Sequence, residues 1–256
     1  MNPIRFTFLG TGTSQGIPVI TCNCVVCTSS DSRDKRTRTS LLIQSGATSV
    51  VIDTGPDFRQ QMLREKVQDL DAVVFTHGHK DHVAGLDDIR PFNYLLNKTI
   101  DVYAEDAVQD ILKNEFSYAF KPQDYPGVPQ ISLTSISEKP FDIRDIHLIP
   151  IRVMHKQLPV LGFRIHDFTY ITDANYIADT ELEKIKGTKI LVLNALRREK
   201  HFSHFNLHEA LEIVEKIKPQ HAYFTHLSHH LGTHAEVERE LPAHVSLAYD
   251  GLSLER

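Results

Sequence analysis

The histidine cluster T-H-G-H-K-D-H at residues 76–82 constrains this chain more than any other feature. Three imidazoles and one carboxylate fall within six positions, directly after the apolar run 72–75. In an extended segment His77 and His79 point the same way, whereas Asp81 and His82 begin a helix and project from another direction. Two pairs of ligands aimed at one point predict a site for two metal ions, rather than a solvated histidine-rich turn.

Three more polar side chains end buried apolar runs elsewhere in the chain. His155 ends residues 146–155, Asp173 ends residues 168–173, and His226 ends residues 221–226. Each run delivers its polar residue to one edge of a sheet, so we expect all three to join the first cluster. Asp173 is expected to bridge the metals because a carboxylate has two oxygens to share.

The alternation of apolar and polar residues predicts a chain rich in strands. The expected strands are residues 4–10, two within 39–55, 71–77, 100–105, 146–155, 161–167, 168–175, 188–196 and 221–227. Helices are expected over 105–114 and 206–219, the second with Asn206 as N-cap and Glu209 as its capping-box partner. Hairpins first and helices later predict two mixed sheets packed face to face with helices outside, in a single domain over residues 1–256.

Composition excludes several classes of protein. A net charge of −5 over 256 residues gives no basic field for long nucleic acid. No apolar run has the length of a membrane span, and no signal peptide is recognisable. Three cysteines cannot form a closed disulfide framework, so a reducing cytoplasmic compartment is expected. The expected partner is a small molecule, with a homodimer as the common symmetric default.

The motifs THGHKDH, TDA and THLSHH together resemble the metallo-β-lactamase-fold hydrolase superfamily, and the likeness covers nearly the whole chain. This resemblance implies an α/β fold, a four-layer αββα sandwich of two mixed β-sheets with the metals at one sheet edge. It also implies two divalent ions, zinc or manganese with iron also acceptable. The implied ligands are His77, His79 and His155 for one ion, Asp81, His82 and His226 for the other, and Asp173 as the bridge.

A second motif, C-x-C-x-x-C, occupies residues 22–27. Cys22, Cys24 and Cys27 can converge on one soft ion, and His229 can fill the fourth tetrahedral position. Unlinked buried cysteines or a redox pair are the alternatives. The arrangement resembles the phosphoribosyl cyclic-phosphate phosphodiesterases of phosphonate degradation, a branch of the superfamily that carries a structural zinc beside its two-metal site.

The narrower resemblance also assigns a role to His204, which precedes the N-cap Asn206. It implies that His204 gives a proton to the leaving oxygen or holds the phosphate, and His201 is a less well-placed rival. The expected reaction is attack by a metal-bridging hydroxide on a small, cyclic ribose phosphate-like diester, with Asp81 managing protons beside its metal. Substrate phosphate is expected to meet positive side chains, for which the sequence offers Arg90, Arg36 and Arg38.

Other functions stay open on sequence alone. A hydrolase of the same fold can act on a thioester, a lactone or the 3′ end of a transfer RNA precursor, although no basic extension for RNA is present. A di-iron redox protein of this fold would resemble H-x-E-x-D, with glutamate where His79 stands. A non-catalytic metal-binding protein is the third alternative. The aromatic and proline-rich segment 116–129 is expected to be either a loop near a pocket or a surface insertion.

Overall fold

The structure, a computed structural model, describes residues 3–121 and 127–256. Its first sheet has the strand order β15-β1-β2-β3-β4-β5-β6. These strands are β1 (Ile4–Gly10), β2 (Ser40–Ser45), β3 (Thr48–Ile52), β4 (Ala72–Val74), β5 (Ile100–Ala104), β6 (Ile131–Ser135) and β15 (Ser253–Glu255). The neighbours β15-β1-β2-β3 are antiparallel and β3-β4-β5-β6 are parallel, so the sheet is mixed.

The second sheet has the order β11-β8-β9-β10-β12-β13-β14, and β7 pairs with β8 beside this path. Its strands are β7 (Phe141–Ile143), β8 (Ile146–His155), β9 (Leu158–Ile165), β10 (Phe168–Tyr170), β11 (Tyr176–Ile177), β12 (Ile190–Asn194), β13 (His221–Thr225) and β14 (Val245–Leu247). The pairs β10·β12, β12·β13 and β13·β14 are parallel, and β8·β9 is an antiparallel hairpin. This sheet is therefore mixed as well.

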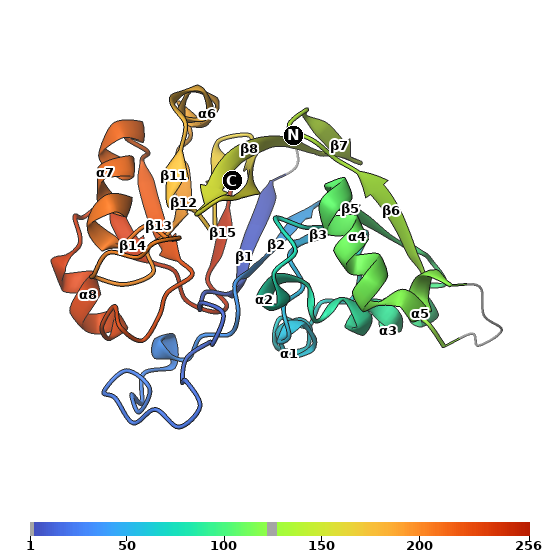
Figure 1. The fold of residues 1–256 in the computed structure, drawn as a ribbon, viewed down its shortest axis with the longest axis horizontal. Coiled ribbons are helices and arrows are strands. Elements are labelled where there is room, and N and C mark those ends of the chain that lie inside the picture. Colours follow the sequence, from blue (N-terminus) through green and yellow to red (C-terminus); the bar gives the residue numbers. More distant parts are fainter. Residues whose placement is uncertain (1–2, 122–126) are drawn as a thin grey trace.

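Helices cover the outer face of each sheet (Figure 1). Beside the first sheet lie α1 (Phe58–Arg64), α2 (Lys80–Val83), α3 (Arg90–Leu96), α4 (Asp106–Glu115) and α5 (Ser117–Phe120), and beside the second lie α6 (Asp179–Ile185), α7 (Leu207–Ile217) and α8 (His234–Glu240). Two short 3-10 helices, η1 (Ser32–Asp34) and η2 (Leu86–Ile89), complete the set. Within the described ranges, every helix is too short or too polar to cross a lipid bilayer.

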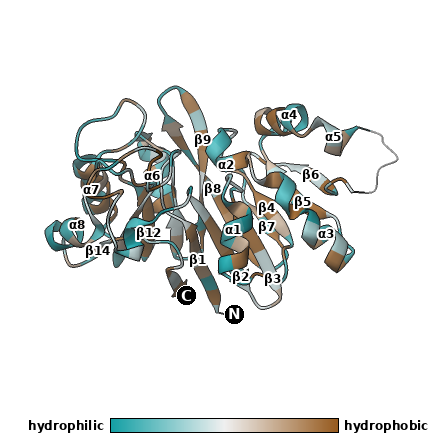
Figure 2. Ribbon diagram, turned by 90° about the horizontal axis from the view of Figure 1, so that it is seen from below, coloured by the Kyte–Doolittle hydropathy of each residue, from teal (hydrophilic) through white to brown (hydrophobic). Residues whose placement is uncertain are grey.

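The alternation of side chains along the strands explains the layers. In β2, Leu41 and Ile43 face the second sheet and join its Phe163 and Tyr170 in one core, whereas Leu42 faces the helices. Between the sheets the rings of Phe6 and Phe168 stack with centroids 3.8 Å apart. Figure 2 shows the brown apolar stretches concentrated along the strands, with teal polar stretches on the outer turns of the helices. Both sheets bury both faces, and the expected four-layer αββα architecture is confirmed.

The sequence placed the long elements well and missed most of the short ones. Each predicted strand overlaps an observed strand, although the strand predicted at 161–167 begins at Leu158 as β9, and the two predicted helices correspond to α4 and α7 with the predicted capping box at Asn206 and Glu209. Strands β6, β7, β11, β14 and β15 and helices α1, α3, α6 and α8 were not predicted. Within the segment 116–129, Ser117–Phe120 forms the short helix α5, and residues 122–126 lie outside the described residues.

Candidate metal centre

Two loops that follow neighbouring parallel strands form one side of the candidate metal centre. The loop after β3 lies against helix α2: the Thr54 amide donates to the His82 carbonyl at 2.8 Å, and the Gly85 amide donates to the Thr54 carbonyl at 2.8 Å. Gly55 allows this close approach, because a Cβ at that position would lie 2.3 Å from the Asp81 carbonyl oxygen. The backbone contacts therefore fix α2, and with it Asp81 and His82, at the edge of the first sheet.

All seven predicted ligands converge at this edge. His77 Nε2 lies 3.0 Å from His79 Nδ1, and the His79 and His155 rings are 5.2 Å apart. His82 Nε2 lies 3.3 Å from Asp81 and 3.2 Å from Asp173, and His226 Nε2 lies 3.2 Å from Asp173. The groups with atoms close enough to share an ion are His77, His82 and Asp173; Asp81, His82 and His226; and His155, Asp173 and His204. Asp173 therefore lies between the two sides of the cluster.

Hydrogen bonds behind the ligands orient their rings. His82 Nδ1 donates to Asp53 Oδ2 at 2.7 Å and His155 Nδ1 donates to the Ser203 carbonyl at 2.8 Å. Each bond fixes Nδ1 as a donor, so Nε2 is the ring nitrogen that would face a metal ion. Sequence reasoning missed Asp53, although it follows the buried strand β3 in the same way that the predicted ligands follow theirs.

The charge balance of the cluster fits a cation. Burial alone would lower the pKa of His82, but the carboxylates of Asp173, Asp53 and Asp81 outweigh it and raise this pKa well above the usual value. Among the described residues, no Lys or Arg pairs with any of these three carboxylates. Buried anions without a cationic partner are costly. Divalent ions would supply the missing positive charge.

Unpaired polar atoms support the same conclusion. Both ring nitrogens of His226 and Nδ1 of His204 are buried without a hydrogen-bond partner among the described residues. His226 Nε2 is close to Asp173, yet the two are not aligned for a hydrogen bond. Ligands that point at a common centre, rather than at each other, produce this geometry. The donor set therefore fits divalent metal ions, and His226 lies where it could be one of their ligands.

His204 lies inside the cluster rather than at the surface. Its ring is 4.5 Å from that of His155 and stacks on His226 at 4.8 Å, and Nδ1 is 3.6 Å from Asp173 Oδ1. Burial lowers the pKa of His204 to about 3, so the ring is neutral in the ligand-free protein. The rival His201 lies farther out, with its Nδ1 accepting a bond from the Ser203 amide at 3.4 Å.

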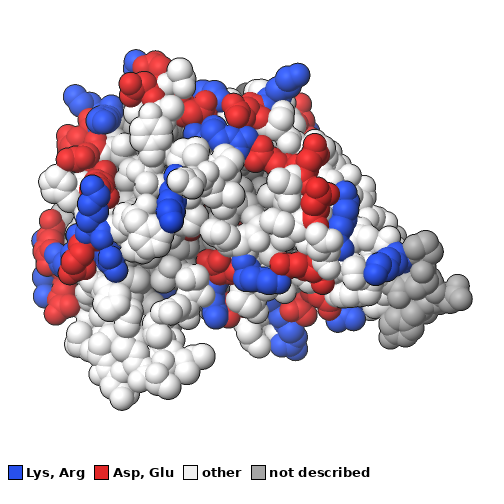
Figure 3. Space-filling view, in the orientation of Figure 1, with Lys and Arg blue, Asp and Glu red and all other residues white. Residues whose placement is uncertain are grey.

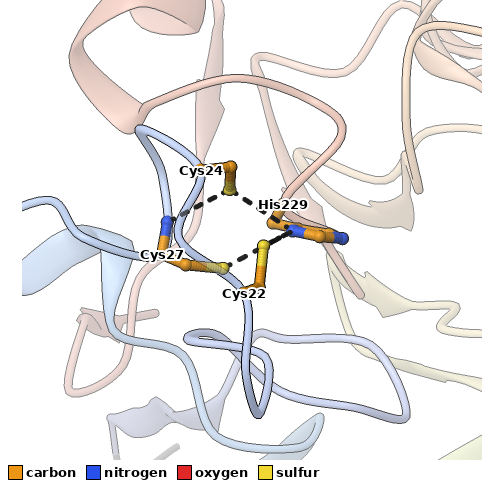
Figure 4. Close-up of side chains that lie close together, drawn as sticks. All are labelled: Cys22, Cys24, Cys27 and His229. Carbon is orange, nitrogen blue, oxygen red and sulfur yellow. Dashed lines mark hydrogen bonds between the residues drawn. The ribbon is translucent and has the colours of Figure 1, made fainter.

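The cysteine motif meets His229 as the sequence predicts (Figure 4). His229 Nδ1 lies 3.3 Å from Cys22 Sγ and 3.4 Å from both Cys24 Sγ and Cys27 Sγ. A tetrahedral zinc with sulfur at about 2.3 Å and nitrogen at about 2.0 Å would separate these atoms by about 3.5 Å. The equal spacing fits one zinc ion better than a redox pair, which would bring only two sulfurs together.

Backbone amides donate hydrogen bonds to two of these sulfurs. The Cys27 amide donates to Cys24 Sγ and is the main cause that lowers the pKa of the Cys24 thiol to about 6. The Val19 amide donates to Cys27 Sγ at 3.3 Å, although burial raises the pKa of that thiol to about 11.

The four residues join the projecting segment between β1 and β2, drawn in blue at the lower left of Figure 1, to the loop after β13. This lobe carries almost no charge on the face seen in Figure 3.

The three arginines differ in their access to substrate. Arg36 is buried, and its guanidinium donates to Thr11 Oγ1 and the Ala248 carbonyl and meets His234 Nδ1. Its expected role in substrate binding is therefore wrong, because these internal acceptors hold the side chain inside the protein. Arg38 pairs with Asp57 at 3.1 Å and Arg90 pairs with Asp87, and both keep partial exposure.

Comparison with known proteins identifies the family. The sequence profile of the β-lactamase superfamily domain matches residues 48–227, which contain all seven predicted ligands. The chain belongs to the metallo-β-lactamase superfamily. The crystal structure of a diphosphatase from the PhnP family is similar to it, with a TM-score of 0.93 and 40% sequence identity over 99% of this chain and 97% of that one. This membership makes the chain a metallo-β-lactamase-fold hydrolase, as the sequence motifs indicated.

Curated relatives of this superfamily member match it over about half of their own lengths. An octanoyltransferase of Porphyromonas gingivalis is 42% identical over 252 residues, which are 97% of this chain and 51% of that protein. Coenzyme PQQ synthesis protein B of Methylorubrum extorquens is 32% identical over 163 residues, 52% of each. The chain thus spans about half the length of the curated relatives it matches. The Zn²⁺-bound structure of PqqB from Methylobacterium extorquens shares the fold, with a TM-score of 0.75 at 18% identity over 98% of this chain and 99% of that one.

Proposed function

We propose that this protein is a two-metal hydrolase that cleaves a phosphodiester or diphosphate bond in a small phosphorylated molecule, such as a cyclic ribose phosphate. The observation that carries the proposal is the convergence of six of the proposed ligands in groups close enough to share an ion, two of which contain Asp173, with His79 beside His77 and His155. Similarity along the whole chain to a diphosphatase supports phosphorus, rather than carbon, as the electrophile.

In the proposal His77, His79 and His155 hold one ion, while Asp81, His82 and His226 hold the other and Asp173 bridges them. Bound together, two divalent ions would lower the pKa of a water and offset negative charge on the phosphoryl oxygens. Zinc, manganese and iron all accept this donor set. The cysteine site would take a structural zinc, because four tetrahedral protein ligands leave no position open for substrate.

His204 and Asp81 are the residues that we propose act on the substrate. The His204 ring is neutral and buried, so its N–H donates to a phosphoryl or leaving oxygen rather than to water. Asp81 Oδ2 lies 3.7 Å from His226 Nε2, and this carboxylate can accept a proton beside the reacting centre. Arg38 and Arg90 are the remaining proposed contacts for distal phosphate, each after release from its aspartate.

A thioester hydrolase is the second candidate function. It is favoured by the relative named octanoyltransferase, because octanoyl groups are acyl groups and this chain aligns with about half of that protein. The same metal ligands could serve acyl and phosphoryl chemistry. A direct comparison of phosphorus esters with a thioester is therefore needed to identify the class of substrate.

The test is a substrate panel with the metal-loaded protein. Bis(p-nitrophenyl) phosphate, a cyclic ribose phosphate, a dinucleoside diphosphate and an octanoyl thioester are compared at matched concentrations. The proposal expects turnover of one or more phosphorus esters, and His79→Ala is expected to reduce that turnover by at least about 100-fold while circular dichroism stays unchanged. Cys24→Ala is a second variant, which removes a ligand of the cysteine site instead of the two-metal site. Hydrolysis of the thioester alone would reject the proposal in favour of the second candidate, and full activity of His79→Ala would reject the metal assignment.

A further inference from the structure

A row of aromatic rings connects the candidate metal centre to the protein surface. Ring centroids are 4.5 Å apart for His155 and His204, 5.2 Å for His204 and His201, and 4.4 Å for His201 and Phe202. His204 is buried, whereas Phe202 is 68% exposed. The exposed phenyl ring of Phe202 is therefore separated only by the His201 ring from His204, which contacts the predicted ligands.

A lysine accompanies this ring. Lys156 directly follows the predicted ligand His155, and its Nζ lies over the Phe202 ring, 5.3 Å from the centroid. Within the part of the chain that the structure describes, no carboxylate pairs with this ammonium. A cation–π contact at an exposed site is weak, so the flexible side chain can leave the ring when a better partner for either group arrives.

The backbone beneath both residues is fixed relative to the metal centre. The Ser203 carbonyl accepts the bond from His155 Nδ1, and the Phe205 amide donates to the Ala174 carbonyl at 2.7 Å. The Lys156 amide donates to Asn175 Oδ1 at 2.6 Å, one residue beyond Ala174. The exposed ring and the ammonium are therefore held at a set distance from the ligands, as a binding subsite requires.

We propose that Phe202 and Lys156 form a subsite for a nucleobase, or a similar planar aromatic ring, attached to the phosphate that is cleaved. The inference rests on the proposed function and narrows its substrate to nucleotide-like phosphate esters. The ring of the substrate stacks on Phe202, and the Lys156 ammonium moves from the phenyl ring to a phosphate oxygen. Stacking suits this surface because every base has a π-face and needs no hydrogen-bond pattern from the protein.

The test measures binding rather than turnover. Calorimetry with the metal-loaded protein compares adenosine 5′-monophosphate with ribose 5-phosphate, which has the same sugar and phosphate but no base. We expect the nucleotide to bind about tenfold more tightly. Phe202→Leu is expected to remove this preference and Phe202→Tyr to keep it. Lys156→Gln is expected to lower the affinity for both ligands by a similar factor.

Tyr94→Leu is the matched control, because it removes another exposed ring, on α3, and is expected to leave the preference intact. Equal binding of the two ligands to the unaltered protein, or a preference that persists in Phe202→Leu, would overturn the subsite. A protein that prefers the nucleotide through Phe202 yet hydrolyses no phosphorus ester would support the subsite and reject the proposed hydrolysis. The two failures are therefore distinguishable.

Discussion

Asp53 Oδ2 lies 2.7 Å from Nδ1 of His82, and both side chains are inaccessible to solvent. The other Asp53 oxygen accepts the Thr76 amide at 2.8 Å, so this one carboxylate ties the loop before His77 to the ring of His82. Its backbone has a φ of +64°, a left-handed conformation that aspartate and asparagine tolerate better than most residues. The contact sets the tautomer of His82 without contributing a ligand atom.

Asp53→Asn is therefore expected to weaken metal binding by about 10–100-fold while the fold persists. The amide can keep the backbone conformation and accept one bond, but it carries no charge to strengthen His82 as a ligand. Competition with a fluorescent chelator measures the change in affinity. Asp101→Asn, the same substitution at an exposed position of β5, is the control and should bind metal normally. Equal affinity for both variants would contradict the role given to Asp53.

Cys24→Ala is expected to lower the zinc content by one ion per chain and to lower the melting temperature. The remaining three ligands hold zinc poorly, and the lobe between β1 and β2 then loses its connection to His229. Elemental analysis after gel filtration gives the stoichiometry, and calorimetry gives the melting temperature. His79→Ala is the matched variant, because it should retain this zinc and lose metal at the other site. An unchanged zinc content in Cys24→Ala would contradict the assignment of a structural zinc to the cysteine site.

The sequence could predict a site residue when a local pattern marked it, and could not when only tertiary contacts decide its role. The strands before His77, His155 and His226 lie in apolar runs, so each run located its own polar terminus. The run before Asp53 carried the same signal, but an aspartate beside Thr54 and Gly55 also resembles an ordinary turn. Only contact with His82 distinguishes the two cases.

Arg36 shows why other predictions failed. Its partners, Thr11, His234 and the Ala248 carbonyl, are distant in the sequence, and no local pattern marks an arginine as internal. The missed edge strands β14 and β15 have three residues each, too few to show alternation. Local periodicity therefore identified the long elements, whereas tertiary contacts decided the rest.

The Arg36–His234 contact predicts a dependence of stability on pH. Burial, together with Arg36, lowers the pKa of His234 to about 4, below its usual value near 6.5. Between these values the unfolded chain binds a proton at His234 and the folded protein does not, so stability falls as the pH drops from about 6.5 to about 4. His234→Gln is expected to reduce this loss by on the order of 1–2 kcal/mol. Urea unfolding at pH 7.5 and 4.5 measures it, and an identical loss in both proteins would contradict the prediction.

The cap of α7 offers a way to separate stability from the position of His204. Asn206 Oδ1 accepts the Glu209 amide at 2.8 Å, and Glu209 accepts the Asn206 amide at 3.0 Å, so Asn206→Ala should cost about 1 kcal/mol of unfolding free energy. Thr233→Ala removes the equivalent cap of α8 and is the control. Because His204 lies two residues before the cap of α7, we expect Asn206→Ala, but not Thr233→Ala, to lower turnover of a phosphorus ester severalfold at equal stability loss. Equal turnover in the two variants would mean that the cap stabilises the helix without positioning His204.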